Sequence, residues 1–89
     1  MARGDYAGAL EILRPLAQGG NSRAQIRLAE MYAMGFGVKQ DSIQSYIWYS
    51  LAARDGNTAA AAGRDRMAAR LQPAQIKQAD KVVEGMRPR

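Results

Sequence analysis

Residue types that commonly carry out chemistry are scarce in this 89-residue chain, which contains no cysteine and no histidine. Their absence excludes thiol nucleophiles, disulfides, Ser-His-Asp arrangements and the usual zinc ligand sets. Asp5 and Asp41 could form a carboxylate pair for acid–base chemistry. Because both lie at predicted helix starts, a helix-capping role explains them fully. We therefore predict no catalytic residue, no metal site and no cofactor.

The segment Gly35-Phe36-Gly37 contains two glycines at a spacing that begins some phosphate-binding loops. No strand is predicted before it, and neither a third glycine nor a Gly-Lys-Ser sequence follows, so the phosphate-loop interpretation is weak. Glycine also supplies the backbone freedom that a tight turn needs. We predict that these residues form a turn between two helices.

Three aromatic residues, Tyr46, Trp48 and Tyr49, lie close together on one predicted helix. Such a set could stack on a ligand, or it could fill the space between packed helices. Its position on a capped helix next to the small pair Ala52-Ala53 favours packing. We therefore place the three aromatic residues in the core.

A mixed charged and apolar stripe is the more suggestive candidate for binding. Arg23, Arg27, Glu30 and Met34 recur at the spacing of one face of a helix. In stacked helix pairs the first helix of each pair lines the concave side, where a partner peptide would lie. We predict these four residues as a partner-binding stripe, and a solvated face without a partner is the alternative.

The formal charge of +5 is concentrated at the C-terminal end, because residues 64–89 hold seven basic and three acidic residues. A basic patch there could meet the phosphates of nucleic acid or another polyanion, and it consists of Arg64, Arg66, Arg70, Lys77 and Lys81. Asp65 and Asp80 interrupt the patch, and no aromatic residues alternate with its basic residues to stack on bases. Nucleic acid is therefore the less favoured partner.

The elements that would position these residues follow from an internal repeat. Sliding the sequence by 36 positions aligns Asp5 with Asp41, and the pair Gly20-Asn21 with Gly56-Asn57. A unit of this length is one antiparallel helix pair, which buries its apolar face only by stacking on a neighbour. The 17 alanines of the chain also favour closely packed helices. We therefore predict an all-α fold, a short α/α solenoid of antiparallel helix pairs with about five helices.

Capping signals set the predicted helix boundaries. Asn21, Asp41 and Asn57 suit N-cap positions, and Pro73 suits the first position of a helix. Helices are therefore expected over about 22–34 and 42–54, and from residues 58 and 73 onward. The last of these helices carries an apolar face that would cover the open end of the solenoid.

Three residues break the regular pattern. Pro15 lies inside the first predicted helix, where it should cause a kink or a tightened turn. Gly63 lies inside the fourth predicted helix, which indicates either close packing against a neighbour or a weak point. Gln72 is a poor N-cap, so the last helix is expected to fray at its start.

The stretch from Ser22 to Asn57 resembles one complete Sel-one-like repeat, a relative of the tetratricopeptide repeat. The resemblance rests on a specific combination of small, apolar, aromatic and acidic positions: Ala24-Gln25, Leu28, Met31-Tyr32, Gly35, Gly37-Val38, Gln40-Asp41, Trp48-Tyr49, Ala52-Ala53 and Gly56. The chain departs from the family pattern at Ala29, where glycine is usual, and at Ser45, where alanine is usual.

The resemblance covers nearly the whole chain and divides this single domain into four parts. Residues 1–21 resemble the second helix of a partial repeat, 22–57 a complete repeat, 58–72 a degenerate helix, and 73–86 a C-terminal capping helix. It implies a right-handed superhelix and a non-catalytic adaptor that binds another protein or a peptide segment. Many bacterial members of the family are exported or associated with the cell envelope.

Two further expectations concern assembly and location. The first predicted helix lacks its partner, so it could pair with a second copy of the chain through Leu10, Leu13 and Leu16. No apolar run approaches the roughly 20 residues that span a bilayer, and the first residues lack the apolar stretch of a signal peptide. As written, the chain is expected to be cytoplasmic, whereas a signal peptide upstream would direct it to the periplasm.

Overall fold

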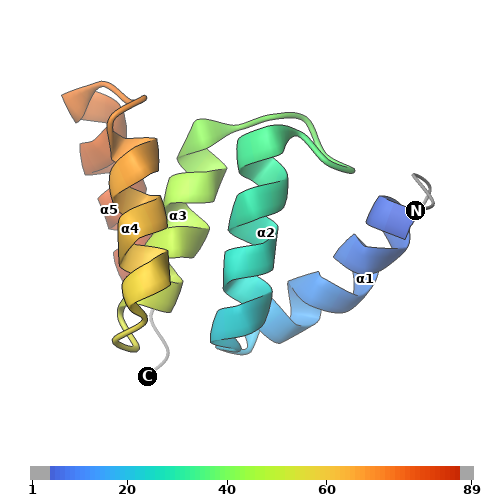
Figure 1. Ribbon diagram of the computed structural model, residues 1–89. Coiled ribbons are helices and arrows are strands. Elements are labelled where there is room, and N and C mark those ends of the chain that lie inside the picture. The colour runs from blue at the N-terminus through green and yellow to red at the C-terminus, as the bar shows by residue number, and fades with distance from the viewer. Residues whose placement is uncertain (1–4, 87–89) are drawn as a thin grey trace.

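The computed structural model describes residues 5–86, which form five α-helices and no strand (Figure 1). The predicted all-α fold is therefore confirmed, and its helices are α1 (Asp5–Gln18), α2 (Ser22–Met34), α3 (Ser42–Ala53), α4 (Thr58–Ala68) and α5 (Pro73–Gly85). The side chain of Asp5 lies outside what the structure describes, so its capping role stays a prediction.

Helix α3 lies at the centre of the molecule. It packs against α2 and against α4, and α5 also packs on it. Helix α1 packs on α2, on the side away from α3 (Figure 1). The buried part of α3 is one continuous run of eight residues, from Ser45 to Ala52. The arrangement is that of stacked helical hairpins, and α3 provides most of the shared core.

The three aromatic residues of α3 belong to this core, as predicted. Tyr46, Trp48 and Tyr49 are all buried. The Tyr46 hydroxyl donates a hydrogen bond of 2.7 Å to Oδ1 of Asp80 on α5. This bond ties the last helix to the central one, because a tyrosine hydroxyl at the edge of a core needs a polar partner.

The predicted capping residues begin their helices. Oδ1 of Asn21 accepts a bond of 2.9 Å from the Ala24 amide, and Oδ1 of Asn57 accepts one of 2.9 Å from the Ala60 amide. Oδ1 of Asp41 accepts bonds from two amides at the start of α3, at 3.0 and 3.1 Å. The two asparagines lie 36 positions apart, and each caps a helix by accepting from the amide three residues later. At these positions the sequence repeat therefore corresponds to repeated local structure.

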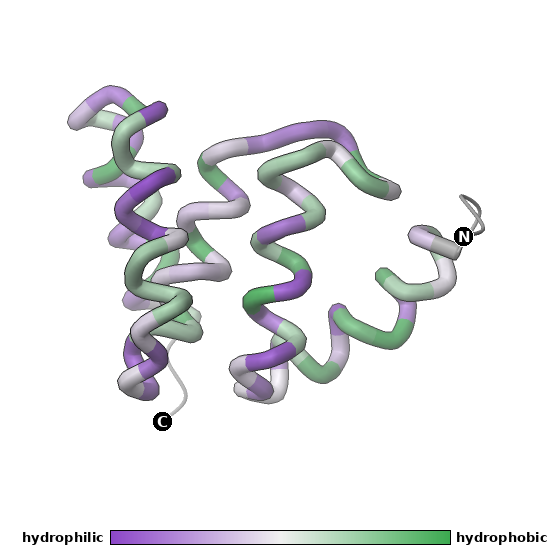
Figure 2. Tube along the Cα trace, in the orientation of Figure 1, coloured by the Kyte–Doolittle hydropathy of each residue, from purple (hydrophilic) through white to green (hydrophobic). Residues whose placement is uncertain are grey.

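The connection between α2 and α3 is a turn, as predicted. Gly35 ends α2 with a φ of +75°, and its amide donates a bond of 2.7 Å to the Met31 carbonyl. Only glycine adopts such a φ at little cost. Val38 then folds back and packs against the core. Figure 2 shows this connection as hydrophobic at its far tip and hydrophilic where it approaches α3.

At Gly63, α4 lies directly against a side chain of α3. A Cβ atom added there would lie 2.6 Å from Cδ1 of the buried Tyr49 ring, far inside van der Waals contact. Of the two interpretations of this glycine, close packing is therefore the correct one.

The other two irregular residues, Pro15 and Gln72, lie inside α1 and at the start of α5. Helix α1 continues past Pro15 as far as Gln18, so the proline does not end it, and the kink or tightened turn expected there stays a prediction. The start of α5 is held by Gln75, whose Oε1 accepts a bond of 2.8 Å from the Gln72 amide. The prediction of a frayed start is wrong, because the side chain of Gln75, inside the helix, satisfies the backbone amide of Gln72.

The two departures from the Sel-one-like pattern meet each other in the structure. Oγ of Ser45 donates a buried hydrogen bond of 2.7 Å to the carbonyl oxygen of Ala29. Both residues are fully buried where α2 and α3 cross. The buried hydroxyl that serine adds at a position where alanine is usual therefore has a hydrogen-bond partner, and this bond joins the two helices.

The leucines of α1 do not form the exposed stripe that was predicted for self-association. Leu10 is only 7% exposed and Leu13 packs against the core, whereas Leu16 is 47% exposed. A spacing of three residues turns through about 300° per step, so Leu16 lies about 120° around the helix from Leu10. Ala17, seven residues after Leu10, is the next fully buried position. The exposed apolar residue beside Leu16 is Ile12.

Candidate functional site

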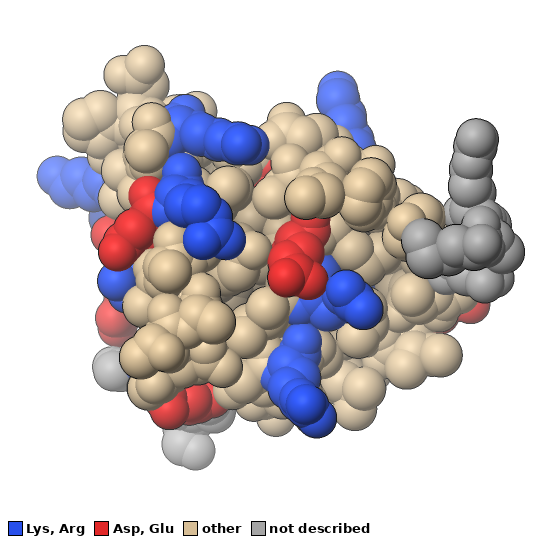
Figure 3. All heavy atoms as spheres, in the orientation of Figure 1, with Lys and Arg blue, Asp and Glu red and all other residues tan. Residues whose placement is uncertain are grey.

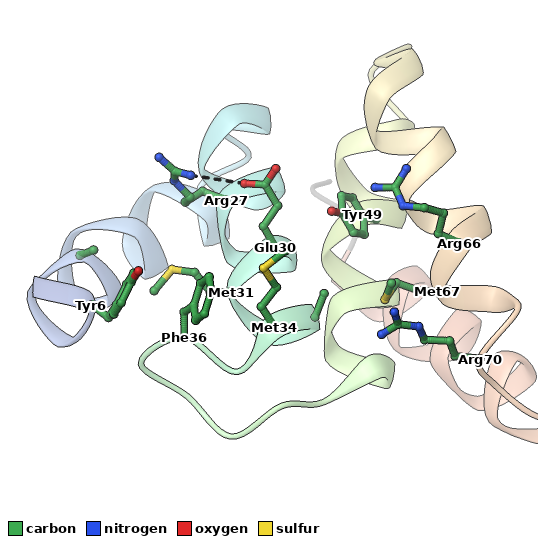
Figure 4. Close-up of a pocket in the computed structure, with 12 residues that line it drawn as sticks. Tyr6, Arg27, Glu30, Met31, Met34, Phe36, Tyr49, Arg66, Met67 and Arg70 are labelled. Atoms are coloured by element: carbon green, nitrogen blue, oxygen red, sulfur yellow. Dashed lines mark hydrogen bonds and ion pairs between the residues drawn. The ribbon is translucent and has the colours of Figure 1, made fainter. Parts of the chain in front are cut away.

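A groove of about 710 Å³ crosses the face formed by α1, α2 and α4 (Figure 4). Side chains from α4 line one end, and side chains from α1 and the turn after α2 line the other. Tyr49 of the central helix reaches the middle of the groove. The residues that line it are Tyr6, Ala9, Arg27, Glu30, Met31, Ala33, Met34, Phe36, Tyr49, Arg66, Met67 and Arg70.

Three residues of the predicted partner-binding stripe line this groove. They are Arg27, Glu30 and Met34, and all three are exposed. Nη1 of Arg27 lies 3.4 Å from Oε1 of Glu30, so these two form an exposed ion pair. Arg23, one turn earlier on α2, is exposed but does not line the groove.

The predicted basic patch divides between two surfaces. Arg66 of α4 and Arg70, which lies in the turn just after α4, line the groove. Arg64 instead lies 3.2 Å from Oδ1 of its neighbour Asp65. The two lysines of the patch, Lys77 and Lys81, are exposed on α5 and do not line the groove. Figure 3 shows basic side chains over α4 and, across a hollow, acidic and basic side chains over α2.

The aromatic end of the groove was not predicted from the sequence. The rings of Tyr6 and Phe36 stack with centroids 5.2 Å apart. Gly37, with a φ of +73°, brings the turn so close that a Cβ atom there would lie 2.6 Å from Cβ of Tyr6. The available signal was Phe36 itself, a large apolar side chain between two glycines, which the turn leaves 42% exposed.

Comparison with known protein families assigns the central part of the chain. The Sel1 repeat family model matches residues 22–57, which comprise α2, the turn and α3. These residues are a Sel1 repeat. Comparison of the chain with curated proteins and with solved structures gave no significant match. Sel1 repeats are helical and solenoid-like, they generally mediate protein–protein interaction, and proteins that contain them are typically non-catalytic adaptors.

The Sel1 repeat supplies the middle of the groove, and the surroundings of its tyrosine there raise the pKa of the hydroxyl. Burial raises the pKa of Tyr49, the charge of Glu30 raises the pKa further, and Arg66 beside the hydroxyl partly offsets both. A neutral hydroxyl can donate to and accept from a bound backbone. The middle of the groove therefore offers a hydrogen-bonding group between the acid of α2 and the arginine of α4.

The arginines at the α4 end have no acidic partner in the part of the chain that the structure describes. Its two ion pairs are Arg27 with Glu30 and Arg64 with Asp65. Arg66 and Arg70 therefore place uncompensated positive charge at one end of the groove, while the opposite end is aromatic. Within residues 5–86, no group of three or more acidic residues is placed to hold a metal ion.

No helix within residues 5–86 is both long and apolar enough to cross a membrane.

Proposed function

We propose that this Sel1 repeat chain is a non-catalytic adaptor whose groove binds a segment of another protein. The proposal rests on one observation: residues of the predicted α2 stripe and residues of the predicted basic patch line the same groove. Its volume of about 710 Å³ lies within the range of well-formed ligand sites and is large enough for several side chains.

The chemistry of the groove suits a peptide. Met34 is 66% exposed and Phe36 is 42% exposed, although both are large apolar residues. Apolar groups gathered at a concave surface commonly mark an interaction site. Methionine adapts its shape to different partners, because its side chain is unbranched and polarisable. The arginines and Glu30 then provide polar contacts around this apolar surface.

The rigid framework behind the groove would limit the cost of binding. Tyr49 is held by the close approach of α4 at Gly63, and α2 is tied to α3 by the Ser45–Ala29 bond. A preorganised site loses little conformational freedom when it binds, so the ordering cost falls mainly on the partner. This supports presentation of a fixed surface as the mechanism.

A nucleic-acid or other polyanion surface is supported less well. Lys77 and Lys81 lie outside the groove, so the basic residues do not form one continuous track. We therefore do not propose nucleic acid as the partner.

The test begins with a phage-displayed library of random short peptides selected on the purified chain. A selected peptide is titrated against the wild type and the double variant Met34→Ala/Phe36→Ala. We expect the double variant to weaken binding about tenfold or more, as truncation at an interface centre does.

Ile12→Ala is the matched control, because Ile12 is as exposed as Met34, at 66%, but lies outside the groove. It should leave the affinity unchanged. Peptides that bind the wild type and the double variant equally would show that the groove is not the binding site, and failure to select any peptide would also contradict the proposal.

A further inference from the structure

The two ends of the groove differ in chemistry, and the difference defines a partner. Arg66 and Arg70 line the α4 end, and both point into the groove in Figure 4. Tyr6 and Phe36 stack at the opposite end. Three methionines line the groove with them: Met31, Met34 and Met67. A bound segment therefore meets positive charge at one end and an apolar surface at the other.

The arginine end suits carboxylates. Arg66 lies in the last turn of α4 and Arg70 lies in the turn just after this helix, and both line the groove at this end. A guanidinium presents a planar fork of donors that matches a carboxylate. Neither arginine has a carboxylate partner within the described residues, so each is available to an incoming acid.

The groove as a whole carries more positive than negative charge. Its charged residues are three arginines and Glu30. Glu30 is already paired with Arg27 at 3.4 Å, so the carboxylate within the groove is matched on its own helix. The surplus charge lies at the C-terminal end of α4 and in the turn after it, which favours an acidic occupant and would accelerate its approach.

We propose that the groove binds an acidic peptide segment, with acidic side chains on Arg66 and Arg70 and a large apolar side chain against Phe36 and Tyr6. This inference rests on the proposed function, since it names the partner chemistry of the same groove. A phosphodiester chain would satisfy the arginines but would leave the aromatic and methionine surface without an apolar partner. The groove therefore favours a protein segment over nucleic acid.

The experiment uses three displayed peptide libraries of fixed composition. In the first, Asp or Glu occupies two positions at one end, Leu or Phe occupies two at the other end, and random residues lie between. In the second library Asn or Gln replaces the acids, and in the third Lys or Arg replaces them. We expect selection on the wild-type chain to enrich peptides from the acidic library.

A peptide from the acidic library is then labelled with fluorescein and titrated by fluorescence anisotropy. The variant Arg66→Gln/Arg70→Gln should weaken binding about tenfold or more, because each charge-assisted pair is lost. The matched control is Lys77→Gln/Lys81→Gln, which removes two exposed charges at the same spacing from α5, outside the groove. It should change the affinity less than about twofold. Circular dichroism verifies that both variants are folded.

The remaining outcomes separate the two proposals. Enrichment of neutral or basic peptides whose binding still falls in Met34→Ala/Phe36→Ala would overturn the acidic partner and leave the peptide-binding groove standing. Binding that is indifferent to both groove variants would overturn the proposed function as well. If the lysine variant weakens binding as much as the arginine variant, and a single-stranded oligonucleotide displaces the peptide, the surface is a general polyanion site and the inference is wrong.

Discussion

The absence of a side chain at Gly63 leaves room for the ring of Tyr49 on the central helix. The ring of Tyr49 occupies the place where a Cβ atom would otherwise lie, and this ring is buried. The same tyrosine reaches the groove, beside Arg66 of α4. A packing contact in the core therefore also positions a residue of the candidate site.

We expect Gly63→Ala to destabilise the protein by about 1–3 kcal/mol, because the added methyl group overpacks the contact with Tyr49. Gly8→Ala is the control, since a Cβ atom at this helical glycine meets nothing within 4 Å. That substitution should stabilise α1 by about 0.5–1 kcal/mol. Urea unfolding of both variants measures the changes. Equal effects of the two substitutions would refute the steric argument.

The two core tyrosines of α3 predict a loss of stability in alkali. Burial, followed by the bond to Asp80, raises the pKa of Tyr46, and burial raises the pKa of Tyr49. The unfolded chain ionises these groups near pH 10, whereas the folded chain retains their protons. This contribution to the free energy of unfolding is therefore complete below about pH 10 and falls as the pH rises above it.

Denaturant titrations across this alkaline range test the prediction. The stability of Tyr49→Phe should fall less steeply with pH than that of the wild type, because one of the two protonated groups is gone. A slope identical to the wild type would show that Tyr49 ionises as readily in the fold as in the unfolded chain.

Local chemistry decides which single residues could be predicted. Asn21, Asp41 and Asn57 cap amides two or three residues away, so their roles follow from sequence neighbours. The stacked pair of Tyr6 and Phe36 lies 30 positions apart and depends on how α1 crosses α2. No local pattern specifies that crossing, so half of the candidate groove escaped prediction.

At the scale of the helix, α1 has one buried and one exposed apolar side. We expect Leu10→Ala to cost about 2–5 kcal/mol, since Leu10 belongs to the core. Ile12→Ala, two residues later on the exposed side, should change the stability by less than about 0.5 kcal/mol. Thermal unfolding of the two variants distinguishes these sides. A large cost at Ile12 would mean that this side is covered in solution.

The helix boundaries were predictable because capping residues and glycines mark them. The buried face of a helix was predictable only where apolar residues recur at alternating spacings of three and four residues. Helix α2 has that alternation, and its buried residues follow it: Ala24, Gln25, Leu28, Ala29 and Met31. The leucines of α1 recur at a spacing of three residues only. Successive leucines therefore point in different directions around the helix axis, which the prediction of a single stripe did not take into account.

For the whole molecule, the packing order predicts a gradient of local stability. Helix α3 packs on three other helices, whereas the main neighbour of α1 is α2. In repeat proteins each element is stabilised mainly by its neighbours, so terminal elements open most easily. In hydrogen–deuterium exchange we expect the amides of α1 to exchange about tenfold or more faster than those of α3, which corresponds to about 1.4 kcal/mol.

Unfolding by heat and by denaturant, each followed by two spectroscopic probes, tests independently whether all helices unfold together. If α1 and α3 show the same protection, the chain opens as one cooperative unit and the nearest-neighbour argument fails. The overall architecture was predictable, because a repeat of 36 residues corresponds to one helical hairpin, and a hairpin buries its apolar face by stacking on its neighbour. The position of α1 relative to the repeat was not, since it depends on a single interface with α2.

The stacking of Tyr6 on Phe36 has a consequence for how binding would respond to warming. One ring comes from the helix expected to open first, and the other from the turn at the edge of the best-packed hairpin. When α1 loosens, the aromatic end loses one of its two rings, while both arginines stay in place at the C-terminal end of α4. A bound partner would then lose its apolar anchorage and retain its charged contacts at temperatures where most of the protein is still folded.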